Sequence, residues 1–237
     1  MRMDAHPASA MSANSTLSPA TLRVIRFIDE LVLRVTQHWL AIAIVVLFFF
    51  QALPWLAPVL MKAGFTTPAE WIYAVYAPTC HQLAYRSFFL IGAQPAYTLA
   101  ELQQHVANDA RGGDIFFWRA FTGDAQLGYK VAYCERDAAM YTTWLLALVI
   151  FAMLQRVHPL KPLSLRVFLL VFIPPIALDG LTQLFGWRES DALLRTLTGF
   201  WFALGTAWLV LPAVDEALRD LHAQTARQLE RVHARTR

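Results

Sequence analysis

One short stretch of the sequence, APTCHQLAYRSFF at residues 77–89, gathers several side chains that can do chemistry. Cys80 directly precedes His81, and Arg86 and Ser87 follow shortly after. A thiolate beside an imidazole can act as a nucleophile. The second cysteine, Cys134, lies far away along the chain. Any joint use of the two thiols therefore depends on the fold, and this pattern alone leaves it open whether the chain is an enzyme.

The composition indicates that these residues are positioned by a membrane protein. The chain has 237 residues and is 57% hydrophobic, above the roughly 45–50% of soluble domains. No charged residue occurs between His38 and Lys62, and a later apolar run contains only Asp179. Such runs are long enough to cross a hydrocarbon core of about 30 Å. The sequence therefore predicts an all-α membrane protein with transmembrane helices at 39–61, 138–155, 167–187 and 193–214.

The segments between and around these spans have their own character. Residues 1–18 are small and polar and predict a disordered N-terminus. Ser18 and Pro19 have the residue types of a helix start, and residues 19–38 predict an amphipathic helix at the membrane surface. Residues 62–137 predict a small cap outside the membrane. Residues 215–237 predict a charged tail in water.

The basic residues predict which side each segment occupies. They precede the first span, follow the last one, and include Arg156, Lys161 and Arg166 between the second and third. The short connection on the opposite side has only Arg188 and Arg195. Because Lys and Arg favour the cytoplasmic side, we expect a multi-pass protein of the cell (inner) membrane with both termini in the cytoplasm and a non-cytoplasmic cap. The net charge of +3 follows this topology, so nucleic acid is not an expected partner.

This topology places both cysteines in a compartment that is oxidising in most bacteria. Two cysteines allow one intramolecular pairing, so Cys80 and Cys134 are a candidate disulfide. Closing that loop would stabilise the fold by about 4 kcal/mol on the chain-entropy argument. Free thiols, one of them reactive beside His81, are an alternative use of the pair.

Three motifs, CHQLAYRSFF, CERDAAMY and DGLTQLFGWRESDALLRTLTG, occur in this order. They resemble the DUF2085 family, a domain-of-unknown-function group of small predicted integral membrane proteins. The family pattern corresponds here to Cys80, His81, Gln82, Arg86, Ser87, Phe88, Cys134, Arg136, Tyr141, Asp179, Gly180, Gln183, Arg195, Thr198 and Gly199. The chain departs from it at Asp137, where the family has the second cysteine of Cys-x-x-Cys, and at Ala139, where it has glycine. The resemblance implies a fold type and a location, and it implies no activity.

The family pattern also implies a different use of the thiols. Cys-His together with Cys-x-x-Cys would supply four soft ligands, the number that a closed zinc site uses. The equivalents here are Cys80, His81, Cys134 and Asp137, and zinc or iron would be the cofactor. Adjacent residues rarely both point at one ion, and a carboxylate is a harder ligand than a thiolate. The disulfide is therefore our first choice, and the metal site our second.

The remaining motif residues are predicted to meet at the outer ends of the helices. Asp179 and Gln183 lie one turn apart on a span, and an ionisable residue inside a span suggests a functional site. We expect Asp179 to pair with Arg195, with Arg136 as second choice. The predicted ligand pocket consists of His81, Arg86, Ser87, Arg136, Asp179, Gln183, Arg195 and Thr198. A lock that only fixes helix packing is the structural alternative.

The sequence thus predicts a membrane protein with an outer-face pocket that binds a small ligand or metal, or performs thiol chemistry. The alternative is a non-catalytic accessory subunit of a larger membrane complex, with the cap as its docking surface. The expected partners are the lipid bilayer and, for the alternative, other membrane subunits or further copies of the chain.

Overall fold

The structure is a computed structural model that describes residues 18–107, 113–155, 157 and 159–235. Residues 1–17 of the segment predicted to be disordered lie outside the described residues. So does Arg156, one of the basic residues used to predict the topology. The chain divides into two compact units, residues 38–217 and the pair of terminal segments that precede and follow them. In the smaller unit, Ser18 caps the first helix by accepting a hydrogen bond from the Thr21 amide, as predicted. Thr36 Oγ1 and His222 Nδ1 lie 2.9 Å apart.

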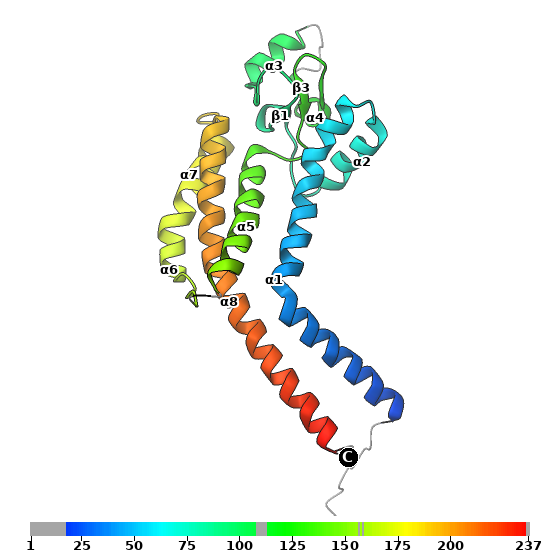
Figure 1. Cartoon of the computed structure of the whole chain (residues 1–237). Helices are drawn as coiled ribbons and strands as arrows, with labels where there is room; N and C mark the ends of the chain where they lie inside the picture. Colours follow the sequence, from blue (N-terminus) through cyan, green and yellow to red (C-terminus); the bar gives the residue numbers. More distant parts are fainter. Residues whose placement is uncertain (1–17, 108–112, 156, 158, 236–237) are drawn as a thin grey trace, which may run out of the picture. The chain divides into compact units, whose positions relative to one another are not determined.

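Four helical segments are long and apolar enough to cross a membrane, which confirms the predicted all-α membrane fold. They belong to α1 (Pro19–Lys62), α5 (Glu135–Leu154), the run Leu165–Leu184, and α8 (Ala192–Arg235). Helix α1 includes both the predicted surface helix and the predicted first span. Figure 1 shows these helices with the cap segment between α1 and α5.

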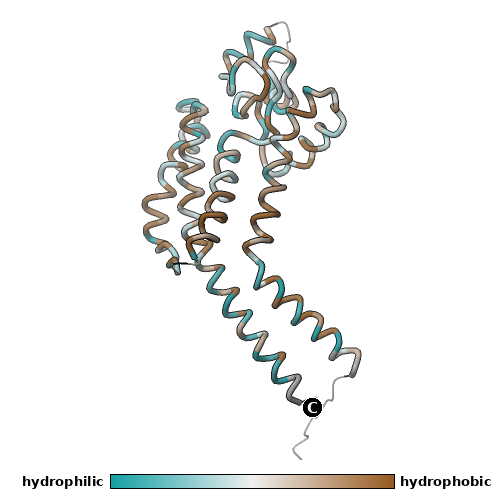
Figure 2. The backbone as a smooth tube through the Cα atoms, viewed as in Figure 1, coloured by the Kyte–Doolittle hydropathy of each residue, from teal (hydrophilic) through white to brown (hydrophobic). Residues whose placement is uncertain are grey.

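Hydrophobic residues cover the outside of the membrane helices as well as their contacts. Figure 2 shows hydrophobic colouring along α5 and along the third span. Large apolar side chains such as Phe49, Ile150 and Leu170 are exposed. A surface of this kind is compatible with lipid, because hydrocarbon tails are as apolar as the side chains that face them.

The third span changes its helix type along its length. It consists of α6 (Leu165–Val167), the π-helical segment η3 (Phe168–Phe172) and α7 (Ile173–Leu184). The π-helical turn directly precedes Pro174 and Pro175, which have no N–H to donate to the preceding turn. Phe172 packs against α8 at Gly205, where a Cβ would lie 2.3 Å from the Phe172 ring.

The cap consists of short elements around its own core. These are α2 (Thr66–Tyr76), the 3-10 turn η1 (Ala84–Arg86), β1 (Phe89–Leu90), α3 (Leu99–His105), α4 (Ile115–Ala120), β2 (Gly123–Asp124) and β3 (Gly128–Lys130). The strands form an antiparallel sheet in the order β1-β3-β2, with Phe89 opposite Lys130. Leu102 and Trp118 are buried in this core. The capping box of Thr98 and Glu101 fixes the start of α3.

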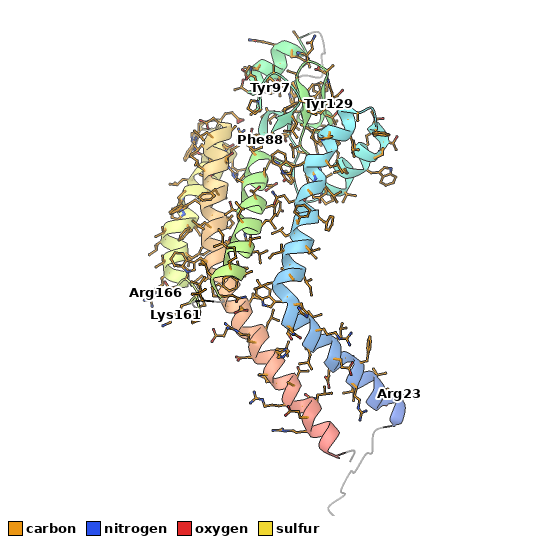
Figure 3. The ribbon with its side chains drawn as sticks, in the orientation of Figure 1. Arg23, Phe88, Tyr97, Tyr129, Lys161 and Arg166 are labelled. Atoms are coloured by element: carbon orange, nitrogen blue, oxygen red, sulfur yellow. The ribbon has the colours of Figure 1, made fainter. Side chains whose placement is uncertain are left out.

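The two ends of the larger unit differ in their side chains. Phe88, Tyr97 and Tyr129 lie at the cap end, whereas Lys161 and Arg166 lie together at the opposite end (Figure 3). Between them, Gln51 of α1 donates a hydrogen bond to Thr142 of α5, and Trp144 of α5 donates one to Thr206 of α8. Interhelical hydrogen bonds of this kind fix the packing of membrane helices.

Candidate functional site

The loop after α2 carries the first cysteine and is held by Gln82. The Cys80 amide donates to the Tyr76 carbonyl, which ends α2 in a tight turn. Gln82 adopts a positive φ of 51°, and its side-chain amide donates to the carbonyl oxygens of Tyr73 and Ala132 at 2.9 and 2.7 Å. Residue 132 belongs to the segment that leads to the second cysteine, so Gln82 joins the two halves of the site.

The second cysteine begins helix α5. Cys134 is the N-cap residue of this helix, and its amide donates to Cys80 Sγ at 3.1 Å. Cys80 Sγ also lies 3.5 Å from His81 Nδ1. The ligand atoms of Cys80, His81 and Cys134 all lie within 4.8 Å of one another. We call these three residues the Cys/His cluster.

The Cys/His cluster is buried on one side and open on the other. Cys80 and Cys134 are 7% and 6% exposed, whereas His81 is exposed. The cluster therefore reaches from the interior of the protein to its surface, and the imidazole offers an entry path to the thiols.

Both cysteines are free thiols, so the structure does not show the predicted disulfide. The two thiols instead interact with each other, with their sulfur atoms within 4.8 Å. This interaction lowers the pKa of Cys80, and together with burial it raises the pKa of Cys134. The Cys80 sulfur is oriented to accept hydrogen bonds from the Cys134 and Gln82 amides, the role of a thiolate.

The Asp137 side chain interacts with both thiols. It lies three residues after the N-cap Cys134, where the first turn of a helix brings the two side chains onto one face. Its carboxyl group interacts with both Cys80 and Cys134. The structure thus brings three of the four predicted metal ligands, Cys80, His81 and Cys134, within 4.8 Å of one another, and Asp137 interacts with both thiols from beside this group.

A second polar group lies around Asp179, which is 2% exposed on α7. Its carboxylate forms ion pairs with Arg136 of α5 and, at 2.8 Å, with Arg188 of the following loop. The expected first partner, Arg195, is wrong, and the second choice, Arg136, is correct. Gly180 leaves space beside the Arg136 guanidinium, since a Cβ there would lie 3.9 Å from it.

Arg195 pairs with a different carboxylate. Its Nη1 lies 2.9 Å from Glu135 Oε2, and Glu135 is 1% exposed. Glu189 extends the chain of charges by contacting both Arg195 and Arg86. We call the ion pairs of Asp179 and Glu135, with their arginines and Glu189, the charge network. The reason for the different pairing is that Glu135 directly follows Cys134 and enters the protein interior at the start of α5.

Three other predicted pocket residues make local contacts. Ser87 and Gln183 donate to carbonyl oxygens of their own segments, Leu83 and Asp179. Thr198 Oγ1 lies 3.5 Å from Asp179 Oδ2 and 2.8 Å from the Leu194 carbonyl. Sequence reasoning missed Glu135, Arg188 and Glu189. The signal for Glu135 was available, because a buried arginine at 195 requires a buried carboxylate.

A cavity of about 380 Å³ adjoins the charge network. Glu135 and Arg195 line it together with Tyr85, Tyr97 and Glu189. Its other residues come from the cap, from the connection between the third and fourth spans, and from the start of α8.

The fold and these two polar groups define a helical multi-pass membrane protein with a small cap. Residues 125–209 match the family described as "Predicted membrane protein (DUF2085)", which confirms the resemblance of the motifs. The chain is also 27% identical, over 188 residues, to the "Uncharacterized protein MJ1492" of Methanocaldococcus jannaschii. That match covers 77% of this chain and 96% of the relative. No solved structure matches the chain.

Proposed function

We propose that this membrane protein binds a thiophilic metal ion, zinc(II), at Cys80, His81 and Cys134. One observation carries the proposal. Two thiol sulfurs and one imidazole nitrogen, from two segments far apart in the sequence, lie within 4.8 Å of one another. Both thiols are buried.

The donor set fits zinc in type and nearly fits it in spacing. Zinc–sulfur and zinc–nitrogen bonds of about 2.3 and 2.0 Å place tetrahedral ligand atoms about 3.3–3.8 Å apart. The Cys/His cluster would therefore contract by about 1 Å or less on binding. Thiolate and imidazole are ligands that zinc prefers, and the amides of Gln82 and Cys134 donate to the Cys80 sulfur. Hydrogen bonds of this kind orient a metal ligand from outside the coordination shell.

The fourth position distinguishes a fixed ion from an exchangeable one. Asp137 interacts with both thiols and can supply an oxygen ligand. The exposed His81 side chain provides an open side where solvent could occupy a position. A site with an exposed ligand and a carboxylate in place of the family's second thiolate binds zinc less tightly than a closed four-thiolate site, and suits reversible uptake.

We further propose that the Cys/His cluster faces the non-cytoplasmic side of the inner membrane. Lys161 and Arg166 lie at the end of the larger unit opposite the cap (Figure 3), and such residues favour the cytoplasm. A membrane-impermeant thiol reagent applied to intact cells tests this in a Cys80→Ser, Cys134→Ser background. It should label Phe116→Cys in the cap and spare Lys161→Cys. Labelling of the second and not the first would reverse the orientation.

Metal analysis of protein purified in mild detergent tests the binding proposal. We expect about one zinc per chain after loading and dialysis, and less than a tenth of that in Cys80→Ser and in Cys134→Ser. His105→Gln is the matched control, since His105 contacts Asp124 of the cap instead, and it should retain the metal. Equal zinc in wild type and Cys80→Ser, or thiols of the wild type found as a disulfide, would refute the proposal.

A further inference from the structure

A groove with entirely apolar walls runs between α5 and α8, far along the chain from the cap residues. It has a volume of about 240 Å³. Ala147 and Phe151 of α5 and Ala207 and Leu211 of α8 are among its walls, and Leu160 of the α5–α6 connection also lines it. The alanines leave the space that larger residues would fill. In a membrane such a groove is filled by an apolar chain, because water has no partner there.

A hydrogen bond between the backbone of the α5–α6 connection and that of α8 holds the connection at the groove. Pro212 lies inside α8 and cannot donate to the carbonyl of Trp208, one turn earlier. The amide of Leu163 donates a hydrogen bond to the Trp208 carbonyl oxygen instead, at 3.3 Å. The connection is thereby tied to α8 at Trp208, a residue that itself lines the groove.

This tie places basic side chains beside the apolar groove. Lys161 lies between the groove residue Leu160 and the tied residue Leu163, and it is exposed. Arg166, also exposed, lies at the same end of the larger unit as Lys161 (Figure 3).

We propose that this groove binds one anionic phospholipid, with an acyl chain along α5 and α8 and its phosphate at Lys161 and Arg166. The apolar walls select a hydrocarbon chain, and the two exposed cations at one end select a negatively charged headgroup. Basic side chains beside a membrane surface each favour anionic lipid. Trp208 is half-exposed and of the residue type found at headgroup depth.

Native mass spectrometry of the detergent-purified chain tests this with phosphatidylglycerol and phosphatidylcholine of equal chain length. We expect one tightly held phosphatidylglycerol, bound more strongly than phosphatidylcholine. Lys161→Gln with Arg166→Gln should reduce that preference roughly 30-fold and leave chain binding intact. Lys62→Gln with Arg119→Gln removes the same charge at two exposed positions of the cap side and should keep the preference.

A second variant tests the groove itself. Ala207→Leu should fill it and displace both lipids, whereas Ala213→Leu, at an exposed position of the same helix, should not. An unchanged preference in the Lys161/Arg166 variant would overturn the proposal. So would unchanged lipid binding in Ala207→Leu, or a second copy of the chain found crosslinked through Ala207→Cys.

Discussion

The Cys/His cluster and the charge network meet at the start of α5, where Cys134 of the cluster is followed by Glu135 and Arg136 of the network. They differ in how their polar groups are paired. In the charge network each buried carboxylate meets an arginine, Asp179 with Arg136 and Glu135 with Arg195. In the Cys/His cluster two thiols and an imidazole lie within 4.8 Å of one another, and the carboxyl group of Asp137 interacts with the thiols from beside them. The charge network, in which opposite charges are already paired, stabilises the fold. The Cys/His cluster, which contains metal-ligand atoms and no paired cation, can bind one.

The largest expected effect concerns the charge network. Asp179→Ala should lower the free energy of unfolding by about 3–5 kcal/mol, because it leaves partly buried arginines without their counter-charge. Asp179→Ala combined with Arg136→Ala should cost less than the single change. The measurement is thermal unfolding in mild detergent, and Glu216→Gln at an exposed position should stay within about 0.5 kcal/mol of wild type. If the single variant behaves like Glu216→Gln, Asp179 faces water and the comparison fails.

The next effect concerns the Cys/His cluster. Zinc at 100 times its dissociation constant should stabilise the wild type by about 2.7 kcal/mol, because only the folded chain brings the three donors together. Cys134→Ser should show no stabilisation, and Asp179→Asn should retain it in spite of its lower starting stability. Calorimetry with and without zinc measures both. Equal zinc stabilisation of wild type and Cys134→Ser would place the metal elsewhere.

A pair of glycines sharpens the role of packing in the charge network. At Gly199 a Cβ would lie 2.7 Å from the Arg136 carbonyl oxygen, whereas at Gly180 the nearest atom would be 3.9 Å away. Gly199→Ala should therefore cost about 2 kcal/mol by forcing α8 from α5. Gly180→Ala should be neutral or slightly stabilising, since alanine favours a helix. Equal effects in unfolding experiments would argue against the close approach.

The smallest expected effect is a pH dependence from the cap. Lys130 is fully buried, donates to the carbonyls of Gln82 and Arg119, and burial lowers its pKa to about 7. Its unfolded pKa is about 10.4, so between these values the unfolded state binds more protons and stability rises with pH. From pH 7.5 to 8.5 the wild type should gain about 1 kcal/mol relative to Lys130→Met. Parallel pH curves for the two proteins would show that Lys130 stays charged.

The sequence predicted the parts of this molecule that follow from local composition. Long apolar runs, one of them with the single charge of Asp179, indicated the four membrane helices, and the motifs pointed to Cys80, His81 and Cys134.

The pairings could not be predicted, because they depend on rotations of helices about their axes. The predicted topology puts both Arg136 and Arg195 at helix ends near Asp179. Only the close packing at Gly199 and the burial of Glu135 decide that Arg136 pairs with Asp179 and Arg195 with Glu135. The state of the cysteines depends on backbone hydrogen bonds to one sulfur, which no spacing in the sequence reveals.

The most direct test of the difference between the two regions is zinc K-edge X-ray absorption on the purified chain loaded with one equivalent of zinc. We expect two sulfur ligands at about 2.3 Å and nitrogen or oxygen ligands at about 2.0 Å in the wild type, and no sulfur ligand in Cys134→Ser, which does not hold the ion. A spectrum with only nitrogen and oxygen ligands, unchanged in Cys134→Ser, would contradict this expectation.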